Sequence, residues 1–299
     1  MNKILITGGS GFLGSNFIKQ IPNKNKIYIY DTSKPRFKSN YIIGSILDSN
    51  KLKKVIKKYN IDTVVHLAAS LGVSNTEKNP DKVLEVNFAG TQKILESLKN
   101  SNIKKFIFAS SSEVYGDSQK KMSEQDILKP KSIYGHTKIL GENLVKTYAK
   151  YIGFDYLIFR FFNVCGRGQR EDFVIPKFFK DLKTKNEINI YGSGNQRRSF
   201  CHVNDACEAM LMTINAGFKN ETFNIGNDKE PISIKNLAEL IRKTSKSECK
   251  IKFQSFKNTD RTKEREIYFR KPDLKKIYKK TKYNPRISLK KIIEEYTDL

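Results

Sequence analysis

The chain has 299 residues, of which 38% are hydrophobic and 29% are charged, and its formal net charge is +25. This length is enough for one large or two modest domains with a substantial core. No run of about 18 apolar residues occurs in the sequence, which excludes a membrane-spanning helix.

The positive charge is spread along the chain rather than gathered in one segment. Lysines fall mostly at positions predicted to face solvent on helices, as in residues 51–58, so we expect no nucleic-acid partner. A net positive field does favour the capture of a polyanionic small substrate. The four cysteines lack paired or histidine-associated spacing, which predicts reduced thiols and no metal site. They are Cys165, Cys201, Cys207 and Cys249.

The first predicted strand, 3–7, starts almost at the first residue, so we expect no signal or transit peptide and a cytoplasmic protein. The strand leads into a glycine-rich turn and a helix near 11–21. Gly8, Gly11 and Gly14 have the G-x-x-G-x-x-G spacing of a dinucleotide site. Such glycines allow a tight turn, a close approach of the backbone to a pyrophosphate, and tight packing of helix on strand. The free amide groups that begin the helix then point at the phosphates.

Asp31 ends the next apolar run, 26–30. A carboxylate at this place accepts hydrogen bonds from ribose hydroxyls and repels a 2′-phosphate, so the sequence favours NAD over NADP. Lys34 and Arg36 follow closely and weaken that preference.

Apolar strand-like runs alternate with amphipathic stretches through the first half of the chain. This rhythm predicts right-handed βαβ units and an α/β fold with a doubly wound parallel sheet, the Rossmann arrangement. The predicted strands are 3–7, 26–30, 41–43, 62–67, 104–109 and 155–161. The predicted helices lie near 11–21, 49–59, 78–99 and 132–152.

Glycines and prolines punctuate shorter elements beyond residue 165, which predicts a smaller α/β substrate domain at the C-terminal side. A helical pattern at 205–216 and a strand at 222–224 are expected to return to the first domain. The predicted division is therefore 1–164 together with 203–228 for the dinucleotide-binding domain, and 165–202 with 229–299 for the substrate domain. From residue 230 on, we expect three short helices and one strand.

Tyr134 and Lys138 are the candidate catalytic pair. Their i to i+4 spacing places the phenol and the ammonium on one face of the predicted helix. A fixed cation beside a tyrosine, together with the positive charge of a nicotinamide, favours the phenolate and lowers its pKa. Ser111 follows the fifth strand, at the carboxyl edge where such sheets bind ligands, and its hydroxyl is suited to hold a substrate oxygen while Tyr134 moves the proton.

With these residues in view, the chain resembles the extended short-chain dehydrogenase/reductase family, in its nucleotide-sugar epimerase and dehydratase branch, over nearly its full length. The core of that family is the glycine fingerprint, a Ser or Thr, and Y-x-x-x-K. Further segments resemble its motifs H-x-A-A at 66–69, N-x-x-G-T at 87–91, R-Y-F-N-V at 160–164 and G-x-G-x-Q-x-R-D-F at 192–200.

The resemblance implies NAD as cofactor, a nucleotide-diphosphate sugar as substrate, and a homodimer. It implies Ser111, Tyr134 and Lys138 as catalytic residues, with Glu113 as a further candidate. The implied substrate contacts are Ser111, Ser112, Asn163, Arg198 and Arg261, the two arginines gripping the diphosphate. The implied cofactor contacts are Gly8, Gly11, Phe12, Leu13, Gly14, Asp31, Thr32, Ile46, Asp48, Leu67, Ala68, Ala69, Asn87, Tyr134 and Lys138.

The chain departs from the family pattern at two places. Ser45 follows Gly44 where an acidic residue often holds the adenine amino group, and Asp48 comes three residues later, so the adenine contact is open. Cys165 stands where R-Y-F-N-V is usually followed by tyrosine, and a small buried filler is the expected role.

Members of the branch first oxidise a sugar hydroxyl, usually on carbon 4, and differ in what happens to the ketone. Epimerases reduce it again on the other face, dehydratases eliminate the 6-hydroxyl, decarboxylases lose a carbon-6 carboxyl, and ketoreductases reduce a ketone that is already present. Glu113 resembles the acidic residue that dehydratases and decarboxylases place before V-Y-G, and a dry site would suit it as a base. Tyr134-Gly135 resembles the epimerase pattern, so we expect an epimerase first and a 4,6-dehydratase second, with a uronate decarboxylase and a ketoreductase as further alternatives behind them. The family also includes NAD-binding regulators without catalytic activity, which usually lose Y-x-x-x-K. This motif is intact here, so we expect an enzyme.

Overall fold

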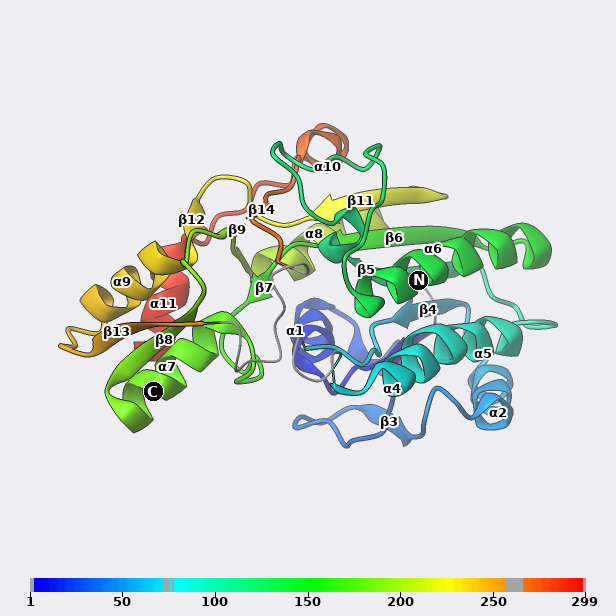
Figure 1. The fold of residues 1–299 in the computed structure, drawn as a ribbon. Coiled ribbons are helices and arrows are strands. Elements are labelled where there is room, and N and C mark those ends of the chain that lie inside the picture. The colour runs from blue at the N-terminus through cyan, green and yellow to red at the C-terminus, as the bar shows by residue number, and fades with distance from the viewer. Residues whose placement is uncertain (1–2, 73–75, 77, 256–265, 298–299) are drawn as a thin grey trace.

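The computed structural model describes residues 3–72, 76, 78–255 and 266–297. A seven-stranded, all-parallel sheet forms its larger unit, in the order β11-β6-β5-β4-β1-β2-β3 (Figure 1). The strands are β1 (Ile4–Thr7), β2 (Ile27–Asp31), β3 (Asn40–Ile43), β4 (Thr63–His66), β5 (Lys105–Ser111), β6 (Asp155–Phe161) and β11 (Glu221–Ile225). The predicted doubly wound sheet is confirmed, because the order runs outward from β1 in both directions.

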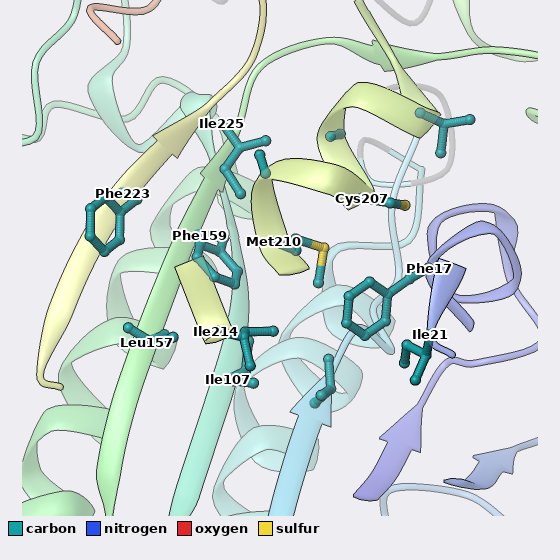
Figure 2. Packing of buried hydrophobic residues seen from close by; sticks show 14 of the residues in the cluster. Phe17, Ile21, Ile107, Leu157, Phe159, Cys207, Met210, Ile214, Phe223 and Ile225 are labelled. Carbon is teal, nitrogen blue, oxygen red and sulfur yellow. The ribbon is translucent and has the colours of Figure 1, made fainter. Parts of the chain in front are cut away.

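Helices cover both faces of this sheet, as the near-continuous apolar strands require. They are α1 (Phe12–Gln20), α2 (Ser49–Tyr59), α4 (Pro80–Leu84), the π-helical turn η2 (Glu85–Ala89), α5 (Gly90–Ser97), α6 (Ile133–Ile152) and α8 (Val203–Asn215). Side chains alternate along β1, so Ile4 and Ile6 pack with α1 and α8, while Leu5 packs with α2 and α5. Figure 2 shows the first of these cores, in which Met210 and Ile214 of α8 lie near the Phe17 ring of α1.

The smaller unit is built from short strands in three small sheets, β10-β7, β12-β9-β14 and β13-β8. Its strands are β7 (Val164–Cys165), β8 (Glu187–Tyr191), β9 (Arg197–Ser199), β10 (Cys201–His202), β12 (Pro231–Ser233), β13 (Lys250–Gln254) and β14 (Phe269–Arg270). Its helices α7 (Val174–Lys185), α9 (Ile234–Thr244) and α11 (Leu289–Thr297) share one core (Figure 1). The described residues after 230 thus form three short strands, where the sequence predicted one. These strands have two to five residues, which is too few to show a clear periodicity in the sequence.

The chain returns to the large sheet after the small unit has begun. β11 pairs with β6 in parallel, and α8 packs against this sheet and beside α1. Helix α10 (Lys275–Thr281) also packs on β11 and α8, and Ile277 lies in the same core. By these contacts α10 lies with the large sheet, although the sequence-based division placed its residues in the substrate domain. Within the described ranges, no helix combines the length and apolar character needed to cross a bilayer.

Candidate active site

A cavity of about 1160 Å³ opens where the carboxyl ends of the strands of the large sheet meet the small unit. Its walls come from the turns after β1, β2, β4 and β5, the start of α6, and β9 and β14 of the small unit. Such a crevice outside the carboxyl ends of the strands is where open α/β sheets bind ligands. Its volume exceeds that of a site for one drug-sized molecule.

The glycine turn forms one end of this cleft and leaves no room for larger side chains. Gly8 has a φ of +72°, and its amide donates to the Tyr30 carbonyl across 3.1 Å. A Cβ on Gly14 would lie 2.4 Å from the Gly8 carbonyl oxygen. Gly11 is the N-cap of α1 and has no side chain that could accept a hydrogen bond from the first amides of the helix. These amides therefore face the cleft without a capping acceptor. This cradle fits the pyrophosphate of a dinucleotide.

Asp31 stands at the cleft beside this turn, with Thr32. Its two carboxylate oxygens accept from the backbone amides of Ser10 (3.0 Å) and Ser33 (3.1 Å), which fix the side chain. Each oxygen keeps a lone pair for a ribose hydroxyl. Lys34 and Arg36 are exposed and do not line the cleft.

The residues expected around the adenine and the nicotinamide lie in two groups. Ile46, Leu67, Ala68 and Ala69, together with Phe12 and Leu13, line the cleft. Asp48 does not; it caps α2 by accepting from the Lys51 amide at 2.9 Å.

Asn87 also lies behind the wall of the cleft. Its side-chain oxygen accepts from the Ser70 amide (2.7 Å) and its nitrogen donates to the Ser70 carbonyl (2.9 Å). It therefore fastens the loop that follows β4, which itself lines the cleft.

Tyr134 and Lys138 begin helix α6, whose N-cap Ser132 accepts from the Gly135 amide. The Lys138 ammonium donates to the Ala109 carbonyl at 2.8 Å and lies 5.6 Å from the centre of the Tyr134 ring. Burial lowers the pKa of Lys138 to about 8, because an ammonium is poorly solvated there. Tyr134, Lys138 and Ser111 all line the cleft.

The electrostatics of Tyr134 differ from the expectation that Lys138 lowers its pKa. Burial raises the pKa of the phenol well above 10, and the Glu113 carboxylate raises it further. The groups that lower it are Ser111, which hydrogen-bonds the phenol, and Arg270. The protein alone thus keeps Tyr134 protonated, and positive charge brought to the cleft is needed to favour the phenolate.

Glu113 is held on two sides. It accepts a hydrogen bond from the Ser132 hydroxyl at 2.6 Å, and its other oxygen lies 3.6 Å from a guanidinium nitrogen of Arg270. The Arg270 side chain is only 12% exposed, and its Nε has no hydrogen-bond partner among the described residues. Arg270 lines the cleft as well.

The small unit contributes Asn163 and Arg198 to the opposite wall. Asn163, at a φ of +38°, donates to the Ser199 carbonyl (3.0 Å), and Arg198 pairs with Glu266 at 3.2 Å. Ser112 also reaches the cleft, although it is almost fully buried. Arg261, expected as the second phosphate clamp, lies outside the described residues.

Arg270 is a cleft residue that sequence reasoning missed. It pairs in parallel register with Arg198, so β9 and β14 present two neighbouring arginines to the same cavity. In a chain with 56 lysines and arginines, no local pattern distinguishes Arg270. Only the pairing of two very short strands reveals it.

A dinucleotide cradle that faces a serine, a tyrosine and a lysine at the carboxyl edge of a Rossmann sheet defines a nicotinamide-dependent enzyme. Residues 4–226 match the model of the NAD dependent epimerase/dehydratase family, and the chain belongs to that family. NAD is accordingly the cofactor, as the sequence predicted, and the relatives include sugar-nucleotide epimerases, dehydratases and decarboxylases.

Close relatives carry more than one activity. A putative UDP-glucose 4-epimerase of Methanocaldococcus jannaschii is 34% identical over 97% of this chain and 96% of its own length. A UDP-N-acetyl-alpha-D-glucosaminuronate decarboxylase of Bacillus cytotoxicus is 32% identical over 98% and 96%. Among solved structures, the UDP-glucuronic acid 4-epimerase of Bacillus cereus, in complex with UDP-glucuronic acid and NAD, is 28% identical with a TM-score of 0.88, covering 99% of this chain and 98% of that one.

Proposed function

We propose that the protein epimerises carbon 4 of a nucleotide-diphosphate sugar, with UDP favoured because several of its relatives act on UDP-sugars. The observation that carries the proposal is the meeting of Ser111, Tyr134 and Lys138 in the cleft that the glycine cradle also lines. These groups can move one proton and steady one oxygen, which is what oxidation of a hydroxyl requires.

In this mechanism, Tyr134 takes the proton of the carbon-4 hydroxyl and later returns it. Ser111, within hydrogen-bond reach of the phenol, donates to the same substrate oxygen. Lys138 supplies a fixed positive charge beside the tyrosine ring. The glycine cradle and Asp31 would hold NAD, which when bound would supply a hydride acceptor for carbon 4 and the positive charge that burial of Tyr134 makes necessary. Asn163 and Arg198 hold the diphosphate while the sugar ring turns over.

Epimerisation is favoured over 4,6-dehydration by the surroundings of Glu113. A base that abstracts the carbon-5 proton must turn its carboxylate toward the sugar. Each oxygen of Glu113 has one neighbour, the Ser132 hydroxyl at 2.6 Å and an Arg270 guanidinium nitrogen at 3.6 Å, and these two neighbours fix the orientation of the carboxylate. These contacts suit a residue that positions its neighbours.

The first test replaces Tyr134 by phenylalanine. We expect turnover to fall by at least about 100-fold, the usual contribution of a positioned acid–base group, with NAD still bound. Product mass should be unchanged from UDP-glucose or UDP-glucuronic acid in the native enzyme, because epimerisation conserves mass. The matched control is Tyr278→Phe, on helix α10 and 56% exposed. Near-native turnover by Tyr134→Phe, or loss of water from the substrate, would contradict the proposal.

A second candidate, decarboxylation of a nucleotide-diphosphate uronate, is favoured by Arg270. A guanidinium that lines the cleft and is only 12% exposed fits a carboxylate on carbon 6. Once carbon 4 is a ketone, that carboxylate is β to it. The carbon 5–carbon 6 bond can then break, leaving its electrons on the ketone as an enolate and releasing carbon dioxide.

Arg270→Met tests whether the sugar carries a carboxylate. We expect kcat/KM for UDP-glucuronic acid to fall about 10- to 100-fold, the value of one charged hydrogen bond, and that for UDP-glucose to change far less. Product mass decides between retained carboxylate and loss of carbon dioxide. Arg242→Met, an exposed arginine of α9, is the control. Equal loss for both sugars would mean that Arg270 binds the diphosphate instead.

We also propose a cytoplasmic homodimer that forms through α4 and α6. The support is limited to exposed apolar side chains on these two helices, Leu84, Leu140 and Tyr151. Isolated apolar residues are common on protein surfaces, but three on adjoining helices suit a helical interface.

A further inference from the structure

A buried polar network joins helix α6 to the carboxyl end of β5, and Glu142 is its centre. Glu142 is 1% exposed and lies one helical turn after Lys138. Arg160 of β6 donates to both of its oxygens, from Nε at 2.9 Å and from Nη2 at 2.7 Å. Ser110 of β5 donates to the same carboxylate at 2.6 Å. Such a forked, fully desolvated pair has fixed geometry.

The far side of the network fixes Arg160. Its Nη1 donates to the Tyr115 hydroxyl (2.9 Å), which in turn donates to Asn224 of β11 (2.7 Å). Asn224 donates to the Met122 carbonyl at 2.9 Å. All these side chains are buried. Arg160 therefore cannot move without breaking several hydrogen bonds, and Glu142 is held with it.

On the near side, α6 is attached to successive residues of β5. Lys138 donates to the Ala109 carbonyl, and the next residue, Ser110, donates to Glu142. The residue after that is Ser111, the proposed substrate contact. Gly141 lets the helix lie directly on the strand, since a Cβ there would be 2.4 Å from the Phe108 ring. These contacts between α6 and β5 thus set the distance between Ser111 and the pair Tyr134–Lys138.

Lys138 is a third buried charge beside the Glu142–Arg160 pair. Its ammonium faces Tyr134 on α6 and the neutral His66 on β4, with Glu113 and Arg270 beyond the phenol and Arg160 behind Glu142. Glu142 is the group that opposes the effect of burial on the pKa of Lys138. The carboxylate that pairs with Arg160 therefore also acts electrostatically on Lys138.

We propose that Glu142 is a positioning residue of the active site, whose carboxylate, fixed by Arg160 and Ser110, keeps the Lys138 ammonium charged and seated at the end of β5. The inference rests on the proposed function only in taking Lys138 as part of the catalytic group. It makes Glu142 act through Lys138, without touching sugar or cofactor.

The test compares the pH dependence of kcat in the full-length native enzyme, Glu142→Gln and Glu142→Asp. Glutamine keeps acceptor and donor atoms but removes the charge, so Lys138 should lose its proton at lower pH. We expect the alkaline loss of activity to move down by about one to three pH units, the effect of one close opposite charge. Glu142→Asp keeps the charge, so its activity should be lost at the same alkaline pH as that of the native enzyme, even if kcat falls.

Glu124→Gln is the matched control. Glu124 is also a largely buried carboxylate of this region, bonded to the Asn224 amide, but it is not among the groups that act on Lys138. In Glu124→Gln the alkaline loss of activity should occur at the native pH. The proposal is overturned if the alkaline loss of activity does not shift in Glu142→Gln, or if it shifts equally in Glu124→Gln.

A folding failure of Glu142→Gln is resolved by adding Lys138→Met. If Glu142 acts on the Lys138 ammonium, removing that charge in the double variant should restore folding. If the double variant also fails to fold, Glu142 acts on Arg160 alone and the proposal is wrong. Failure of the proposed function is distinct, since native enzyme would then fail to convert any sugar nucleotide, or Tyr134→Phe would retain turnover.

Discussion

His66 is a neutral imidazole with both ring nitrogens engaged. The Thr91 hydroxyl donates to the Asn87 carbonyl at 2.6 Å, so His66 Nε2 must donate to Thr91 (3.1 Å), and Nδ1 accepts from Thr7 (2.7 Å). Burial and, to a smaller extent, the charge of the neighbouring Lys138 lower the pKa of His66 to about 3. The H-x-A-A motif thus places a hydrogen-bonding joint between β1, β4 and α5 rather than an acid–base group.

This joint predicts a pH dependence of stability. The folded pKa of His66, about 3, is below its usual 6.5, so between these values the unfolded state binds the extra proton. The contribution is complete above pH 6.5 and is lost as pH falls toward 3. We expect His66→Gln to show a smaller drop in free energy of unfolding from pH 7 to pH 4 than the native protein, measured by urea denaturation.

The exposed His136 provides the control for that measurement. His136→Gln should follow the native pH dependence. A native-like slope in His66→Gln would mean that His66 is not the group that couples acid to unfolding.

The candidate site shows which residues a sequence can supply. Motif residues with a fixed distance from a strand end, such as Gly8, Ser111 and Tyr134, could be placed in advance, because the βαβ unit brings those ends together. Asp48 could not, since the same Asp suits a helix cap and an adenine contact. Arg270 required the pairing of β14 with β9, a non-local contact that no window of sequence contains.

At the scale of elements, the turn between β1 and α1 is limited by backbone rather than by side chains. A Cβ on Gly14 would meet the Gly8 carbonyl oxygen at 2.4 Å and the Gly9 Cα at 2.6 Å. Neither atom belongs to a flexible side chain, so the turn itself would have to shift. The helix and the phosphate cradle are therefore one unit.

Gly14→Ala should consequently damage binding and stability together. We expect a destabilisation of about 1–3 kcal/mol, typical of an overpacked site, and a clear loss of NAD affinity by calorimetry. Ser15→Ala, the next residue of α1, is the control and should bind NAD normally. Native affinity in Gly14→Ala would show that the cradle tolerates displacement of the helix.

The segment predicted as one helix, 78–99, contains a change of winding. Within its described part, α4 passes into the π-helical turn η2 and then into α5. Asn87 sits in that turn and fastens Ser70. Periodicity cannot reveal one widened turn, because the apolar face continues through it; the need for a side chain to reach the loop after β4 explains its position.

At the scale of the whole molecule, the large sheet was predictable and the small unit was not. Six of its seven strands were predicted from short apolar runs, and helices separate all of these that follow one another in the chain except β2 and β3, a pattern that determines topology through right-handed crossovers. The seventh, β11, was expected from its apolar core alone. The strands of the small unit have two to five residues, and their pairing depends on contacts distant in sequence.

The return of α8, β11 and α10 to the large sheet has a consequence for how such an enzyme can change. The chain crosses between the two units repeatedly, so no single cut or fusion point separates a cofactor half from a sugar half. Recombination cannot exchange the sugar-binding part as a module without removing an edge strand from the sheet. New substrates must therefore be reached by substitutions in the cleft itself, at positions such as Arg270 on the shortest strands of the fold.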